Sequence, residues 1–292
     1  WGNAGGGATQ AIMPLILGAI VMFGVEQAMG WRIALLVPGV MMLIVGVLYW
    51  KFTQDCPQGD FKELRANGVE VGSGKKGGVA ILMQAARNYR VWILFVSYAA
   101  CFGIEIFIHN VAAMYYVDHF NMGLKEAGLT AGIFGLLALF ARALGGIISD
   151  KVAVSKGLDG RTKILFILIL CEGLFLMLFS QMNVISLAII SMTVFALFTH
   201  MACGATYALL PLIDRTALGG VAGILGAGGN VGAVAAGVRL KGVLDVQTCL
   251  MVLGGLVTVA AFSVILIRFS VEHKAKEQQL FEQAILERNS VA

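Results

Sequence analysis

Arg142 is the side chain whose type and place in the sequence most directly indicate chemistry. It is the only basic residue well inside a long apolar stretch. A charge near the centre of a bilayer costs at least about 2.5–3.5 kcal/mol, so such a residue is a functional candidate by default. Its planar, permanently charged guanidinium suits a planar oxyanion better than a lysine ammonium does. Gly135, Ala138 and Gly146 share its helix face and would leave space in front of it. The alternative is a structural charge that a neighbouring carboxylate neutralises.

A second group of candidates forms one helical stripe in an earlier apolar stretch. The stripe consists of Tyr98, Phe102, Glu105 and His109, at i, i+4, i+7 and i+11. The two aromatic rings suit either the wall of a ligand site or ordinary core packing. Glu105 could carry a proton, or it could pair with Arg142 when no substrate is present. We expect His109, and His200 further along the chain, to be satisfied polar residues rather than ligands.

The glycine-rich segment 219–237 has small residues at every third or fourth position, so one of its faces is nearly bare. In a membrane such a face is commonly a close-packed helix seam. A binding role is indicated by Asn230, which we expect to be a buried amide on the bare face. The run Gly229-Asn230-Val231-Gly232 also has a counterpart in Gly2-Asn3-Ala4-Gly5. We therefore expect Asn3, Gly5, Asn230 and Gly232 to line one site, contributed by equivalent helices of two parallel halves.

The composition identifies the class of protein. The chain is 59% hydrophobic and 13% charged, with a mean hydropathy of +0.85, whereas about a quarter of the residues in soluble domains are charged. We therefore expect an all-α polytopic membrane protein. The five cysteines are scattered and predict neither disulfides nor a metal site. No nucleophile–base set, metal cluster or cofactor motif is apparent, so we expect no catalytic residues, no cofactor and no enzyme activity.

The apolar stretches of spanning length define about eight transmembrane helices. They cover residues 1–24, 31–52, 91–117, 127–149, 163–181, 184–212, 219–238 and 247–269. Between the second and third lies a charged, glycine-rich segment that lacks the apolar residues for a core. The predicted organisation is two helices of an N-terminal half at 1–52, a linker at 53–90, a six-helix C-terminal half at 91–269 and a polar tail at 270–292.

The distribution of positive charge predicts the orientation. Most of the 21 Lys and Arg residues fall in the linker, the tail and the loops that share their side, which the positive-inside rule assigns to the cytoplasm. We expect an integral protein of the plasma (cell inner) membrane, with linker and tail cytoplasmic. The net charge of +4 follows from this bias, so it gives no reason to expect a nucleic-acid partner.

One loop resembles a motif of the major facilitator superfamily. Gly146-Ile-Ile-Ser-Asp150-Lys151, followed by Arg161 and Lys163, is similar to the GxxxD(R/K)…(R/K) loop that follows the second helix of each half in that superfamily. The resemblance implies a major-facilitator-type bundle in which the spans are helices five to twelve of twelve. The chain would then be a fragment truncated at its N-terminus, lacking the first four helices and the partner arginine that they would carry.

Longer runs resemble the nitrate/nitrite porter family of that superfamily. They are Trp1-Gly-Asn-Ala-Gly-Gly-Gly-Ala-Thr-Gln10 with Pro14, Trp31-Arg-Ile-Ala with Val37-Pro-Gly39, Gln54-Asp-Cys-Pro-Gln-Gly59, Phe140-Ala-Arg142 and Gly226-Ala-Gly-Gly-Asn-Val-Gly-Ala233. The resemblance implies a secondary active transporter for nitrate or nitrite that works by alternating access, as a proton symporter or a nitrate/nitrite exchanger, in nitrate assimilation. It also implies that Tyr98 and Phe102 flank the anion. If transport is coupled to protons, we expect Glu105 to be the titrating group, because it is the only carboxylate on the stripe.

Three alternatives remain open. A transporter of the same fold for another small anion, such as a carboxylate, would also need Arg142 but not the two glycine–asparagine faces. A non-transporting membrane sensor is the second alternative. An integral-membrane enzyme is the third, and it would need a reactive cluster near one interface.

Overall fold

The computed structural model describes residues 4–69, 77–240 and 245–291. The chain forms two compact units. One is Ile12–Gly77, and the other is Gly78–Ala292 together with Trp1–Ala11. The secondary structure assigned to the described residues is helical, apart from one isolated bridge between Cys56 and Gly59.

The smaller unit contains most of α1 (Ala4–Met22), α2 (Gln27–Phe52) and α3 (Phe61–Ala66). The turn between α1 and α2 contains Gly24, whose φ of 88° favours glycine. The two helices then pack closely, because a Cβ at Gly30 would lie 3.1 Å from the Leu17 side chain. Both helices have spanning length, as the sequence predicts.

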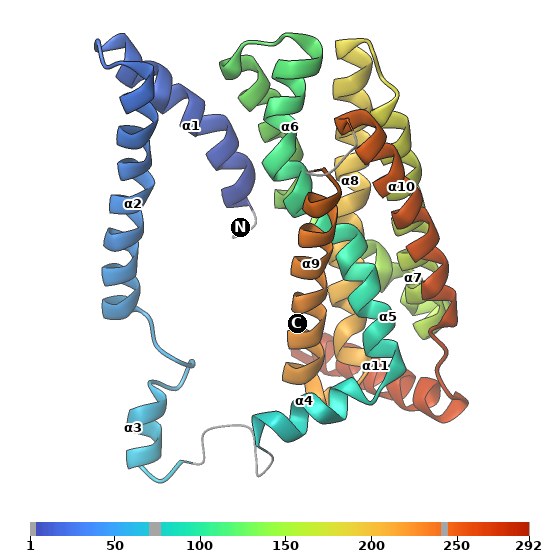
Figure 1. The fold of residues 1–292 in the computed structure, drawn as a ribbon. Coiled ribbons are helices and arrows are strands. Elements are labelled where there is room, and N and C mark those ends of the chain that lie inside the picture. Colours follow the sequence, from blue (N-terminus) through green and yellow to red (C-terminus); the bar gives the residue numbers. More distant parts are fainter. Residues whose placement is uncertain (1–3, 70–76, 241–244, 292) are drawn as a thin grey trace. The chain divides into compact units, whose positions relative to one another are not determined.

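The larger unit is a helical bundle (Figure 1). Its elements are α4 (Gly78–Ala86), α5 (Tyr89–Tyr98), the π-helix η1 (Ala99–Gly103), α6 (Ile104–Phe120), α7 (Leu124–Ser180), α8 (Ile185–Leu209), the 3-10 helices η2 (Leu210–Leu212) and η3 (Arg215–Ala217), α9 (Leu218–Leu240), α10 (Val246–Ser263), η4 (Val264–Leu266) and α11 (Val271–Val291). The segment α5–η1–α6 runs without a break in helicity and is one long span with a π-helical turn inside it.

Helix α7 is two spans joined at Gly157. A straight helix of its 57 residues would be about 85 Å long, far more than the ~30 Å of a bilayer core. At Gly157 the backbone leaves helical geometry, with φ 57° and ψ −147°. Beyond it Arg161 Nη1 reaches back to within 2.5 Å of Asp150 Oδ1. Among the described residues seven helices have spanning length and composition; because α7 supplies two spans, the expectation of about eight is confirmed.

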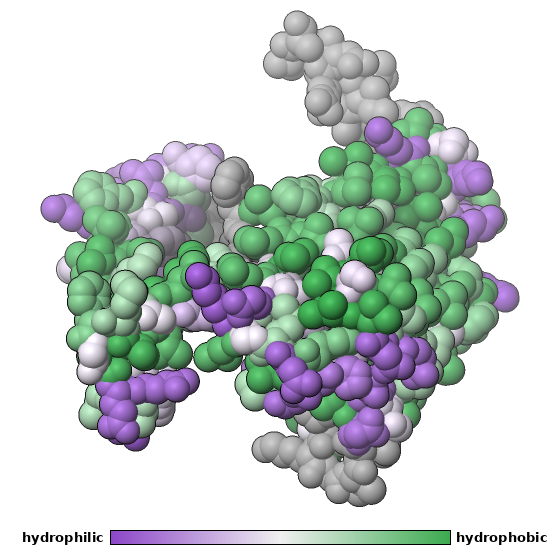
Figure 2. Space-filling model, turned by 90° about the horizontal axis from the view of Figure 1, so that it is seen from above, coloured by the Kyte–Doolittle hydropathy of each residue, from purple (hydrophilic) through white to green (hydrophobic). Residues whose placement is uncertain are grey.

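The outer faces of the bundle helices are apolar. On the first limb of α7, Leu136, Leu139 and Phe140 are exposed, whereas Phe134 and Ala138 are buried. Apolar residues dominate the view in Figure 2, and the hydrophilic ones gather in separate patches. A soluble bundle would carry mostly polar residues on these outer helix faces, so the protein is integral to a membrane.

The division of the chain into halves, linker and tail stays a prediction. Within the expected linker range, 53–90, the structure forms α3 and α4. Helix α4 packs against α9, since Ala85 is fully buried and a Cβ at Gly220 would lie 3.0 Å from the Ala85 side chain. The α4 segment therefore belongs to the larger unit, although the composition of 53–90 as a whole predicts a solvated segment.

Candidate membrane anion site

The structure pairs Arg142 of α7 with Glu105 of α6. Arg142 Nη2 donates to Glu105 Oε2 over 2.5 Å, and the two side chains are 14% and 6% exposed. An arginine at this depth is tolerable because a carboxylate compensates its charge. Of the two roles that the sequence leaves open for Glu105, pairing with Arg142 is the one the structure shows. The pair lies inside the helical bundle, where an incoming anion could replace the carboxylate.

Two aromatic rings form a wall beside this pair. Tyr98 and Phe102 stack with their centroids 4.9 Å apart and their planes 9° from parallel. The Arg142 guanidinium lies over the Phe102 ring, 5.4 Å from its centroid. Tyr207 of α8 meets the Tyr98 ring edge-on at 5.4 Å. The stripe expected from the sequence is therefore assembled next to Arg142, as a surface that would suit the face of a flat ligand.

The π-helical turn η1 lies within this wall, between Tyr98 and Ile104. Such turns are rare and occur frequently at functional sites. Helix α9 packs closely against η1 and the two aromatic residues because its glycines carry no side chain. A Cβ at Gly229 would lie 3.1 Å from the Tyr98 ring, and one at Gly232 would collide with the backbone of Ala99. The glycine-rich segment thus packs directly behind the aromatic pair.

The glycine face that packs coincides only in part with the expected one, which is Gly219, Gly223, Gly226, Gly229/Asn230, Ala233 and Gly237; of the glycines in that set, Gly229 makes a close approach. Among the described atoms, Cβ positions at Gly219, Gly223, Gly226 and Gly237 would have no neighbour within 4 Å, whereas Gly220, Gly228 and Gly232 make the close approaches. Asn230 is exposed, and its amide donates to Gly226 O of the same helix over 3.0 Å. The expectation of a buried Asn230 is therefore wrong: its Cβ points about 100° away from that of Gly229, off the packed face.

The N-terminal turns of α1 belong to the larger unit and lie against α6 and α7. Gly7 packs onto the backbone of Gly135, and a Cβ at Gly6 would lie 3.1 Å from the His109 ring. The Gln10 amide donates to His109 O. Gly5 is exposed with open space beside it. Asn3 lies outside the described residues, so its predicted approach to Asn230 stays a prediction.

His200 of α8, like His109, is expected from the sequence to be a satisfied polar residue, but Nδ1 of each ring is buried with no hydrogen-bond partner among the described residues. The His200 side chain is fully buried, and its Nδ1 lies 3.3 Å from Glu105 Oε2. Cys203 Sγ lies 3.7 Å from the same oxygen. With Tyr207, these residues fall at i, i+3 and i+7, the spacing of one helix face. That spacing is the signal that could have identified α8 as a wall of the site.

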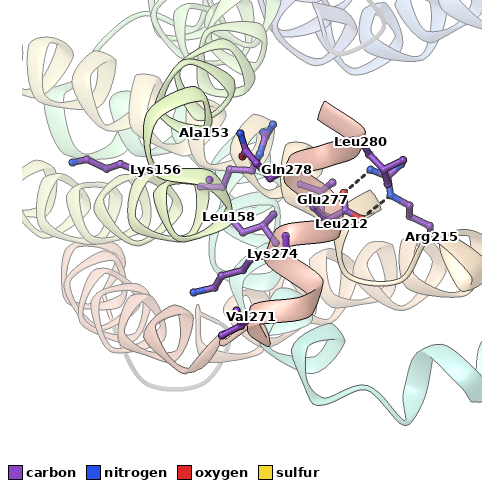
Figure 3. Close-up of a pocket in the computed structure, with 13 residues that line it drawn as sticks. Ala153, Lys156, Leu158, Leu212, Arg215, Val271, Lys274, Glu277, Gln278 and Leu280 are labelled. Atoms are coloured by element: carbon purple, nitrogen blue, oxygen red, sulfur yellow. Dashed lines mark hydrogen bonds and ion pairs between the residues drawn. The ribbon is translucent and has the colours of Figure 1, made fainter. Parts of the chain in front are cut away.

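A separate cavity of about 640 Å³ lies at the end of the bundle, between α11, α7 and the 3-10 helices η2 and η3 (Figure 3). Several of the charged residues that line it are paired: Arg215 makes two hydrogen bonds to Glu277, at 2.9 and 2.6 Å, and Lys274 donates to Asp159 at 2.6 Å. The first of these pairs is dashed in Figure 3. None of the predicted site residues lines this cavity, and its paired charges anchor α11.

Comparison with known proteins agrees with the expected architecture. The sequence pattern of the Major Facilitator Superfamily matches residues 1–236. The chain belongs to this superfamily. Its members are transporters rather than enzymes, and the major-facilitator fold expected from the Gly146–Asp150 loop is confirmed.

Within the superfamily the chain is similar to nitrate transporters. It is 39% identical over 235 residues to "High affinity nitrate transporter 2.5" of Arabidopsis thaliana, covering 80% of this chain and 46% of that protein. It is 40% identical over 235 residues to "Nitrate transporter 2.1" of Chlamydomonas reinhardtii, covering 80% and 43%. To "High affinity nitrate transporter 2.7" of Arabidopsis thaliana it is 33% identical over 281 residues, covering 92% and 57%. The chain spans about half the length of these curated relatives.

Proposed function

We propose that the complete protein is a secondary active transporter of nitrate, nitrite or both, and that Arg142 anchors the anion. The observation that carries this proposal is the Arg142–Glu105 pair beside the stacked rings of Tyr98 and Phe102. The curated relatives named above support the choice of nitrate. Tyr98, Phe102, Gly5, Gly232, Asn3 and Asn230 remain proposed contributors to the site.

The pair supplies a mechanism for binding. Nitrate is a planar monoanion whose oxygens can take the place of the Glu105 carboxylate on the guanidinium fork. Arg142 also has a buried Nε–H for which the described part of the chain offers no hydrogen-bond partner. An unmet donor in an apolar setting costs about 1–3 kcal/mol, so a second hydrogen bond from the guanidinium would be favourable. The Tyr98 and Phe102 rings would then lie against the face of the anion.

Transport follows if binding is linked to alternating access of two helical halves, which is the general scheme for this architecture. We propose the plasma (cell inner) membrane as the location, with the α11 end of the bundle cytoplasmic, because the positive charges gather there. Coupling would be by proton symport or by nitrate/nitrite exchange, and Glu105 is the candidate proton carrier because displacement from Arg142 leaves it without that cation.

Uptake by the complete protein in proteoliposomes tests the proposal. We expect labelled nitrate to enter and to be competed by unlabelled nitrate and nitrite, but not by acetate or formate. A carboxylate that competes as well as nitrate would favour the alternative of a small-carboxylate transporter. Binding of nitrate without any counterflow would favour a sensor.

A further inference from the structure

The orientation of the His200 ring is fixed by a backbone carbonyl. His200 Nε2 lies 2.8 Å from Phe134 O, and the two rings are packed with their centroids 5.1 Å apart. A carbonyl oxygen can only accept a hydrogen bond, so His200 Nε2 must carry the hydrogen. In a neutral imidazole with hydrogen on Nε2, the other nitrogen presents a lone pair.

That other nitrogen faces a second acceptor. His200 Nδ1 lies 3.3 Å from Glu105 Oε2, and the His200 side chain is fully buried. A lone pair on nitrogen and a carboxylate oxygen repel each other at this distance unless a hydrogen lies between them. His200 Nδ1 has no hydrogen-bond partner among the described residues, so the arrangement favours one proton more than a neutral His200 and an ionised Glu105 contain. This proton sits on His200, on Glu105 or between them.

The surrounding charges link this proton to an anion. Arg142 Nη2 donates to the same Oε2 atom, His109 Nε2 lies 3.9 Å from Oε1 and the Cys203 thiol lies 3.7 Å from Oε2. With the additional proton, Arg142, Glu105 and His200 together carry one net positive charge. A monovalent anion at Arg142 balances that charge. Without the proton, Arg142 and Glu105 already balance each other, and an arriving anion would add an uncompensated negative charge inside the membrane.

We propose that Glu105 and His200 form the site of the coupling proton, held between Glu105 Oε2 and His200 Nδ1, and that proton and nitrate are bound and released together. This rests on the proposed function for the identity of the anion, and it decides between the two coupling modes in favour of symport. The proton comes from water on the side that supplies the nitrate and forms a bond to His200 Nδ1 or Glu105 Oε2. That bond breaks on the other side, and the proton returns to water without any transfer of electrons.

The test uses the complete protein in proteoliposomes with the substitution His200→Gln. Glutamine keeps a polar side chain in the site, but it cannot titrate. We expect nitrate counterflow to weaken, because the Glu105 carboxylate then compensates Arg142 without a proton on His200, and we expect nitrate accumulation driven by a pH gradient to be lost. For one coupled proton, accumulation across one pH unit is limited to about tenfold, and this ratio should fall to about one. Proton uptake recorded with a pH-sensitive dye as nitrate enters should disappear in parallel.

His119→Gln is the matched control, because His119 of α6 contacts Gln247 and lies outside the Glu105 contacts. Its accumulation ratio and its proton uptake should equal those of the unchanged protein. The proposal is overturned if His200→Gln still accumulates nitrate with the proton, or if its nitrate counterflow equals that of the unchanged protein.

A second measurement covers the case in which His200→Gln fails to fold. Nitrogen-15 resonances of histidine in the unchanged protein report whether each ring nitrogen carries hydrogen. We expect one histidine with a hydrogen on Nε2 and a shared or full hydrogen on Nδ1, and we expect nitrate to strengthen the Nδ1 signature. A buried histidine whose Nδ1 stays unprotonated at every nitrate concentration would overturn the proposal. Absence of nitrate counterflow in the unchanged protein would overturn the proposed function instead, and the resonances would still decide whether the proton is present.

Discussion

Arg142 and Glu105 share a hydrogen bond of 2.5 Å between helices α7 and α6, and each of the two charges is the other's nearest compensation inside the bundle. Removing one partner of a buried ion pair leaves an uncompensated charge, which typically costs about 3–5 kcal/mol. An anion can therefore bind Arg142 only if the negative charge of Glu105 is neutralised by another group or by a proton. Anion binding at Arg142 is therefore linked to protonation at Glu105.

Glu105→Gln tests whether Glu105 titrates during transport. The amide is similar in size and can still bond to Arg142, but it cannot ionise. We expect nitrate counterflow to continue and gradient-driven accumulation to be abolished in proteoliposomes. Glu126→Gln, at the start of α7 and exposed, is the control and should accumulate nitrate normally. Unchanged accumulation by Glu105→Gln would refute the coupling role.

The packed face of α9 gives a prediction about stability. A Cβ at Gly228 would lie 2.5 Å from Phe95 O and 3.0 Å from the Phe95 ring, whereas a Cβ at Gly226 would have no described atom within 4 Å. Gly228→Ala should force α5 and α9 apart and lower the free energy of unfolding by about 1–3 kcal/mol. Gly226→Ala should have no such effect. Thermal unfolding of the two variants in the same detergent compares them directly, and equal melting temperatures would contradict the assigned seam.

The spans could be predicted from the sequence because each needs only a long apolar run, and seven helices of the described residues have that character. The neighbourhood of Arg142 was also predictable, since Glu105, Phe102 and Tyr98 share a stripe. The rotation of each helix about its own axis could not be predicted from the sequence. Small residues occur on more than one face of α9, and the neighbouring residues Ala85, Phe95, Tyr98, Ala99 and Phe102 decide which face packs.

The sequence also could not predict which residues of other helices contact His200, so its place beside Glu105 differs from the structural role expected for it. A single histidine in an apolar helix is usually a satisfied polar residue, and one hydrogen bond to Phe134 O does satisfy half of its ring. The other ring nitrogen faces Glu105, which lies far earlier in the chain; the spacing of His200, Cys203 and Tyr207 indicates a shared face of α8 but does not identify Glu105 as the residue that this face meets. Contacts between distant helices depend on the whole bundle.

The ion pair that anchors α11 predicts a pH dependence. The hydrogen bond from Arg215 lowers the pKa of Glu277 below its ordinary value of 4.5, despite partial burial that opposes this. A carboxyl whose pKa is lowered by folding stabilises the folded state fully above its unfolded pKa, and it loses that contribution as the pH falls through the folded pKa. Because Arg215 is half exposed, we expect less than about 1 kcal/mol.

Hydrogen exchange of residues 271–280 measures this effect. The protection of α11 should decrease below about pH 4.5 in the unchanged protein, and Glu277→Gln should show the reduced protection already at neutral pH. Glu272→Gln is the control, because Glu272 is exposed on the same helix. If Glu277→Gln and the unchanged protein are protected equally at pH 7, the pair contributes nothing to docking α11.

Arg142→Lys tests whether the anchor depends on geometry as well as charge. Lysine keeps the positive charge that Glu105 compensates, so the variant should insert and fold. Its ammonium is a compact, strongly hydrated donor and cannot present the two parallel hydrogen bonds of a guanidinium, nor stack on Phe102 in the same way. Hydrogen bonds to charged groups contribute about 1.5–3 kcal/mol, so losing one should weaken the apparent nitrate affinity by about ten- to a hundredfold. Arg32→Lys, on α2, is the control and should leave affinity unchanged. Nitrate uptake by Arg142→Lys with unaltered affinity, at normal expression, would show that Arg142 is a structural charge and that the anion binds elsewhere.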